Sequence, residues 1–131
     1  MSEIKHDIKT MDDIRSLVDT FYGTVREDDL IGPIFLGKIT DWSVHLEKMY
    51  RFWQTILLEE YTYNGAPFPP HATLPIQRAH FDRWLNLWYQ TVDSLFQGKV
   101  AEEAKWRGER MAGVFLSKLD YLQQNNIQPL I

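Results

Sequence analysis

The chain contains no cysteine. This absence excludes disulfide bonds, cysteine-ligated zinc or iron–sulfur centres, a thiolate nucleophile and thioether attachment of a cofactor. The chain also has no apolar run near the roughly 20 residues that a membrane span requires. Residues 1–5, Met-Ser-Glu-Ile-Lys, lack the apolar core of a signal peptide. We therefore expect a cytoplasmic protein without a membrane partner.

Basic residues form no cluster, and the formal net charge is -4. Nucleic acid is therefore not an expected partner. Aromatic residues, by contrast, make up 14% of the chain and include five tryptophans, which is consistent with a large apolar cofactor. The length of 131 residues predicts a single domain over residues 1–131, with flexible tails at 1–9 and 124–131.

The spacing of apolar residues predicts an all-α fold. The first helix starts after Thr10, which can cap it together with Asp13. Its apolar face contains Ile14, Leu17, Val18, Phe21 and Val25. The Gly-Pro within 30–35 predicts a tight turn or one helical turn. Three more long helices are expected at about 40–58, 77–97 and 101–123, with Gly98 as the C-terminal cap of the helix at 77–97.

His71 stands between prolines, in Pro69-Pro70-His71-Ala72-Thr73-Leu74-Pro75. The prolines restrict this segment to at most one or two helical turns, so the imidazole is displayed on a short, stiff piece of chain. A neutral imidazole held in this way is a good ligand for iron or zinc. Among the other histidines, His6 is expected in solvent, His45 on the apolar face of 40–58, and His80 at the surface or a cofactor edge.

Several other kinds of site lack the residues they need. A di-iron carboxylate bundle requires two Glu-x-x-His pairs, and only Glu3 to His6 has that spacing. The chain has no His-Glu-x-x-His, no Gly-x-Ser-x-Gly and no phosphate-binding glycine loop. The neighbouring carboxylates Glu59-Glu60 and Glu102-Glu103 point in different directions and are typical of a solvated surface.

Haem, which needs an axial imidazole, apolar walls, cations near its propionates and a controlled distal pocket, fits the remaining residues. His71 is the candidate iron ligand, and Lys48 can reach a propionate. Candidate wall residues are Phe35, Met49, Phe52, Leu74, Phe81 and Trp84. Ordinary helix packing is the competing interpretation of these aromatic faces.

Several spaced blocks of sequence, in a fixed order from about Met11 to Leu122, then point to one family. The blocks are Phe21-Tyr22; Ile31-Gly32-Pro33-Ile34-Phe35; His45 with Met49-Tyr50-Arg51-Phe52-Trp53; Tyr63-Asn64-Gly65; His71-Ala72-Thr73-Leu74-Pro75; and His80-Phe81-Asp82-Arg83-Trp84-Leu85. In this order they resemble the truncated haemoglobins, and specifically group III. Groups I and II usually carry Gly-Gly pairs at helix junctions, and this chain has none.

The resemblance implies a globin-like, two-over-two helical sandwich with haem b between the helices. It implies that His71 is the proximal iron ligand and that Tyr22, His45 and Trp84 are the distal polar residues. Phe35 would lie against the porphyrin and Lys48 at a propionate. His45 has three open roles: donor to the ligand, gate, or sixth ligand of iron. His80 is a further candidate at the haem edge, while Met49 and Phe52 would shape the pocket.

Three functions remain open from the sequence. The leading hypothesis is reversible binding of dioxygen or another diatomic ligand such as CO or NO, in a monomer or weak homodimer. The second is a haem enzyme, peroxidase-like or a nitric oxide dioxygenase, that depends on an external reductase. The third is a helical interaction module without a cofactor.

Overall fold

A computed structural model describes residues 5–63 and 76–124. Throughout this part of the chain the regular elements are helices: α1 (Met11–Glu27), α2 (Gly32–Lys38), α3 (Trp42–Leu58), α4 (Arg78–Leu95) and α5 (Lys99–Gln124). The predicted all-α class is confirmed. None of the helices within the described ranges is long and apolar enough to cross a membrane.

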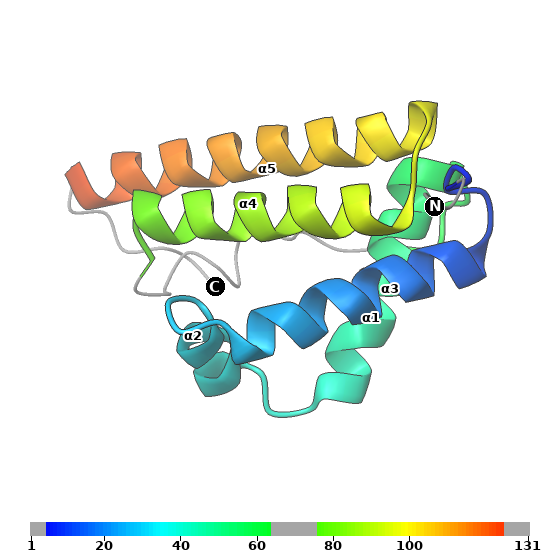
Figure 1. Cartoon of the computed structure of the whole chain (residues 1–131). Coiled ribbons are helices and arrows are strands. Elements are labelled where there is room, and N and C mark those ends of the chain that lie inside the picture. The colour runs from blue at the N-terminus through cyan, green and yellow to red at the C-terminus, as the bar shows by residue number, and fades with distance from the viewer. Residues whose placement is uncertain (1–4, 64–75, 125–131) are drawn as a thin grey trace.

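The four long helices form two pairs (Figure 1). α4 runs alongside α5, and α1 packs across α3. A contact between α1 and α4 joins the pairs, while the short α2 packs against the end of α1. The fold is therefore the two-over-two sandwich that the resemblance implied.

α1 forms where the sequence predicts it. The Thr10 hydroxyl accepts a hydrogen bond from the Asp13 backbone N–H at 3.2 Å, and the Asp13 carboxylate accepts one from the Thr10 N–H at 3.1 Å. This reciprocal cap satisfies donors that the first helical turn leaves unpaired. The face spaced at helical intervals is buried as expected, and Tyr22 is buried beside it.

The corner between α1 and α2 depends on a close backbone approach. A Cβ atom on Gly32 would lie 3.0 Å from the Val25 carbonyl oxygen, which is tighter than most side chains accept. Pro33 follows in the first turn of α2, where its fixed φ suits a helix start. α2 is seven residues long, more than the turn or single helical turn that the sequence suggested.

One expectation was wrong at the junction between α4 and α5, where Gly98 was predicted to cap the helix at 77–97. Phe96, in extended conformation, takes the C-cap position of α4 instead of Gly98. Gly98 has a φ of +139°, and a Cβ there would lie 2.6 Å from the Asp7 side chain. The Asp7 carboxylate accepts hydrogen bonds from the N–H groups of Val100 and Ala101 at 2.9 and 2.8 Å, so it caps the start of α5.

The contact between Asp7 and α5 also bears on the N-terminal segment, because residues 1–9 were expected to form a flexible tail. Within its described part, residues 5–9, Asp7 is bound to α5 and Ile8 is 1% exposed. Ile8 is a single apolar residue in a polar stretch, so no periodic pattern in the sequence predicts its burial. Its burial depends on contacts with distant parts of the chain.

The two helix pairs meet at a fully buried indole. Trp88 of α4 stacks on Trp53 of α3 with ring centroids 4.5 Å apart. Its N–H donates to the Ala104 carbonyl oxygen of α5 at 2.8 Å, which satisfies a buried donor. α5 comes this close because of Gly108, where a Cβ would lie 2.6 Å from Trp88 Cδ1.

We expect Gly108→Ala to destabilise the fold by about 1–3 kcal/mol, because the added methyl group overpacks a buried indole. Gly113→Ala on the same helix is the matched control, since nothing lies within 4 Å of its Cβ position. Alanine should stabilise that position by up to about 1 kcal/mol. Urea unfolding of both variants in the same ligation state measures the difference. Equal midpoints for Gly108→Ala and the parent chain would show that Trp88 is loosely packed.

Candidate functional site

A cavity lies where the two helix pairs separate. Its empty volume is about 870 Å³, which includes space open to solvent at its mouth. The lining residues are Tyr22, Ile31, Ile34, Phe35, His45, Met49, Phe52, Trp53, Ile76, His80, Phe81, Trp84, Met111, Ala112 and Phe115. All five helices contribute, and most of these side chains are apolar. The apolar, aromatic-rich lining matches the chemistry of a site for a large apolar ligand.

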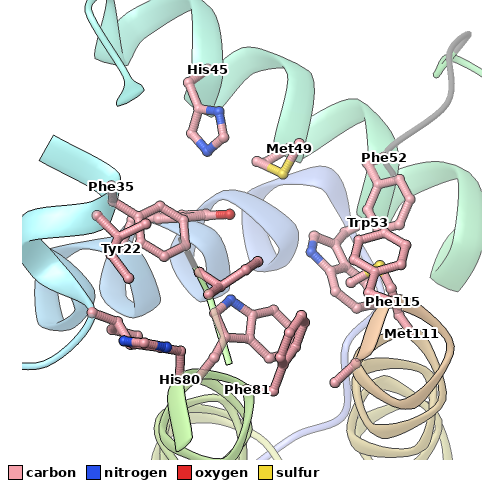
Figure 2. A pocket seen from close by; sticks show the side chains of 15 residues that line it. Tyr22, Phe35, His45, Met49, Phe52, Trp53, His80, Phe81, Met111 and Phe115 are labelled. Carbon is pink, nitrogen blue, oxygen red and sulfur yellow. The ribbon is translucent and has the colours of Figure 1, made fainter. Parts of the chain in front are cut away.

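Tyr22 brings a phenol into this apolar space from α1. The side chain is 6% exposed, and Figure 2 shows its hydroxyl directed toward the middle of the cavity. Burial raises the pKa of Tyr22 well above its ordinary value of 10. The phenol therefore keeps its proton across the physiological range and is available as a hydrogen-bond donor.

His45 of α3 lies directly beside Tyr22. Their ring centroids are 5.1 Å apart and nearly perpendicular. His45 Nε2 is buried, and Figure 2 shows that both His45 and Met49 extend from α3 toward the cavity. The Trp42 ring also packs edge-on against the imidazole at 5.7 Å and lies 6.0 Å from the Tyr22 ring, while the Arg26 guanidinium lies 4.4 Å from the Trp42 ring. The half-buried imidazole thus contacts two aromatic rings that also contact each other.

α4 and α5 form the facing wall. Trp84 packs edge-on against Phe21 at 5.3 Å and is stacked on Trp88 at 5.9 Å, which orients its indole. His80 has a structural task as well: its Nδ1 accepts the Gln77 backbone N–H at 2.9 Å and caps α4. Figure 2 shows Met111 and Phe115 approaching from α5.

Eight of the residues singled out in the sequence line the cavity. They are Tyr22, Phe35, His45, Met49, Phe52, His80, Phe81 and Trp84. Lys48 is exposed and is not part of the wall. His71 and Leu74 lie outside the described residues, so their assignments stay predictions.

Seven further lining residues were not assigned to the site. They are Ile31, Ile34, Trp53, Ile76, Met111, Ala112 and Phe115. Some signal was present, because Ile34 and Trp53 adjoin assigned residues, while Met111 and Phe115 are apolar and four residues apart, on one face of the helix predicted at about 101–123. Periodicity identified an inward face but did not distinguish core from cavity wall.

Comparison with known proteins explains the cavity. A sequence model of the bacterial-like globin family matches residues 6–114. The group 3 truncated haemoglobin of Campylobacter jejuni is 30% identical over 121 residues, spanning 88% of this chain and 95% of that protein. The crystal structure of the group III truncated haemoglobin from Campylobacter jejuni matches with a TM-score of 0.81 over the same shares of the two chains.

The chain is a bacterial-like globin. Within that family it is a truncated haemoglobin of group III. Globins bind haem, and the cavity fits that cofactor in this structure. Its walls are apolar and rich in aromatic side chains, and a protonated phenol is enclosed in it. The described residues therefore support a haem-binding globin.

One ion pair connects α4 to the corner between α1 and α2 in this globin. Asp28, whose side chain is 3% exposed, accepts hydrogen bonds from the N–H groups of Leu30 and Ile31 and contacts the Arg83 guanidinium at 2.7 Å. Burial by itself raises the pKa of Asp28, but the bonds from Ile31, Arg83 and Leu30 outweigh it, so the pKa lies below the ordinary 3.8. The carboxylate is therefore ionised at neutral pH.

Asp28 should contribute stability that depends on pH. Because its folded-state pKa is lowered, the contribution is complete above the ordinary carboxyl pKa and is lost as pH falls through the folded-state value. We expect Asp28→Asn to cost about 1.5–3 kcal/mol at pH 7, and the difference from the parent chain to shrink toward pH 3. Urea unfolding at several pH values, in one ligation state, measures it. A constant difference over that range would contradict the ionic contribution.

Proposed function

We propose that this globin holds haem b in the cavity and binds dioxygen, or another diatomic ligand, reversibly at the iron. The observation that carries the proposal is the enclosed Tyr22 phenol, protonated and directed into an apolar space beside His45. When bound, the haem supplies a ferrous iron whose ligand takes on partial negative charge. A donor held in a dry pocket interacts with that charge more strongly than one in water.

The proposed iron ligand is His71. Its support comes from the sequence, where the flanking prolines restrict the segment, and from the resemblance to group III truncated haemoglobins. Lys48, an exposed cation one turn beyond His45 on α3, is the proposed partner of a propionate. Because Lys48 is exposed, its ammonium group can stay hydrated while it contacts a propionate.

The chain's own residues then divide the work. Tyr22 and Trp84 donate hydrogen bonds to the bound ligand, each worth about 1–3 kcal/mol. His45, whose ring lies 5.1 Å from that of Tyr22, adds a third polar group to the cavity lining. Phe35, Met49 and Phe52 exclude water from the apolar space and limit access.

Loading with haemin tests the cofactor assignment. The parent chain should bind one haemin and give ferrous and CO-bound spectra typical of a single axial imidazole with an open sixth position. His71→Ala should lose the imidazole-ligated ferrous spectrum, whereas His6→Ala, at a side chain 63% exposed, should keep it. A colourless chain that does not take up haemin would instead indicate a helical interaction module.

Tyr22→Phe removes one donor without changing the size of the ring. We expect dioxygen to dissociate about tenfold faster, because one hydrogen bond to the ligand is lost. Tyr89→Phe is the matched control, since its hydroxyl donates to Glu109 on the outer side of α4 and α5 at 2.9 Å. Flash photolysis or stopped-flow displacement by CO measures the rates. If both variants release dioxygen at the parent rate, Tyr22 does not contact the ligand.

A haem enzyme is the second candidate, favoured by the closeness of Tyr22 and His45. Two polar groups whose rings are 5.1 Å apart can polarise a bound peroxide as well as dioxygen. Turnover with peroxide or nitric oxide would need a separate reductase. Stopped-flow mixing of the ferric form with peroxide, and of the dioxygen complex with nitric oxide, distinguishes repeated turnover from a single stoichiometric reaction.

A further inference from the structure

The corner between α1 and α2 is organised by one carboxylate. Asp28 Oδ2 accepts the N–H groups of Leu30 and Ile31, both at 3.0 Å, and the Asp28 carbonyl oxygen accepts the Gly32 N–H at 2.9 Å. These bonds fix the direction in which α2 leaves the corner. α2 in turn carries Phe35 into the cavity.

The second oxygen of the same carboxylate reaches α4. Asp28 Oδ1 accepts the Arg83 Nε–H at 2.7 Å, and an outer guanidinium nitrogen lies at the same distance. Arg83 is followed immediately by Trp84, which lines the cavity. One side chain therefore connects the end of α1, the start of α2 and the part of α4 that carries a distal donor.

The ion pair supplements the aromatic packing of this part of the cavity wall. Among the described helices, close backbone packing joins α2 to α1. Phe35 from α2 and Trp84 from α4 line the same cavity. The Trp84 indole packs on Phe21 and Trp88, and the ion pair adds a direct connection between the start of α2 and α4.

We propose that Asp28 and Arg83 are positioning residues of the distal pocket: their ion pair fixes α2 relative to α4 and so holds Trp84 at its place beside a bound ligand. Neither residue lines the cavity, so neither contacts the ligand. The inference rests on the proposed function, because it concerns how well a donor reaches that ligand. A small displacement matters, since hydrogen bonds weaken steeply with distance and misalignment.

The geometry of the Asp28–Arg83 pair is that of an ordered contact and differs from a loose ion pair on the surface. Surface ion pairs usually contribute little because solvent screens them and both side chains must be ordered. Here the carboxylate is 3% exposed and is already fixed by two backbone donors, so only the Arg83 side chain has to be ordered. A guanidinium donates from more than one nitrogen, which restricts its orientation further.

The test uses three variants of the haem-loaded protein. Arg83→Met keeps an unbranched apolar stem but removes the charge and the donors, and Arg83→Lys keeps the charge but loses the paired donors. Asp28→Asn preserves an oxygen that can accept the Leu30 and Ile31 N–H groups while removing the ion pair. Arg78→Met is the control, because Arg78 is exposed on the same helix and lies 4.0 Å from Asp82.

Two readouts report donor position separately from stability. We expect Arg83→Met and Asp28→Asn to broaden or shift the C–O stretching band of the ferrous CO complex and to speed dioxygen dissociation about three- to tenfold, that is, by up to the value of one hydrogen bond. Arg83→Lys should lie between them and the parent, and Arg78→Met should equal the parent. The double variant Arg83→Met/Asp28→Asn should change no more than either single variant, because both remove the same contact.

Hydrogen exchange of the α2 backbone gives an independent measure in the same samples. It should speed up in Arg83→Met and remain unchanged in Arg78→Met. Variants that melt earlier but keep the parent CO band and the parent dissociation rate would overturn the inference and leave a purely structural ion pair. A parent chain that binds no haem would overturn the proposed function itself, and this inference with it.

Discussion

The contact of Phe21 with two indoles is the interaction on which the rest of the structure depends. Its ring packs edge-on against Trp84 at 5.3 Å and against Trp88 at 5.0 Å. This contact joins α1 to α4 and therefore joins the two helix pairs. On one side of the joint Trp88 closes a solid core with Trp53 and α5. On the other side Tyr22 and Trp84 line the cavity.

The contact of Phe21 with Trp84 and Trp88 also explains why the Tyr22 phenol can remain buried in an apolar space. Tyr22 follows Phe21 directly, so the residue that anchors α1 also fixes the start of the next side chain. Edge-to-face aromatic contacts have preferred geometry and limit rotation of the rings. Tyr22 makes such contacts with Phe21, Phe35 and His45. Under the proposed function, this packing orients the Tyr22 hydroxyl before a ligand binds, which lowers the cost of reorganisation.

Much of the fold could be predicted from the sequence because helical periodicity and caps are local signals. Thr10 with Asp13 marked the start of α1, and the apolar spacing identified its buried face. Features that depend on distant partners were missed. Gly98 looks like a helix cap in the sequence, whereas its backbone accommodates Asp7, which lies far away along the chain. The burial of Ile8 belongs to the same contact region.

For the site, the strongest signal in the sequence was the order of several blocks shared with one family. Individual residues were less informative, because the apolar face of a helix can line either a core or a cavity. Ile76 and Ala112 line the cavity because of the tertiary arrangement of the helices, which leaves no local signal in the sequence. The Asp28–Arg83 pair was missed for a similar reason: the two residues are 55 positions apart, and both are of types that usually face solvent.

A crystal structure of the haem-loaded protein tests the central claim most directly. The account predicts a porphyrin between the two helix pairs, with its iron bound to the His71 imidazole and the Tyr22 hydroxyl on the opposite face. A haem held outside the cavity, or an iron bound to His80 while His71 lies away from it, would contradict the account.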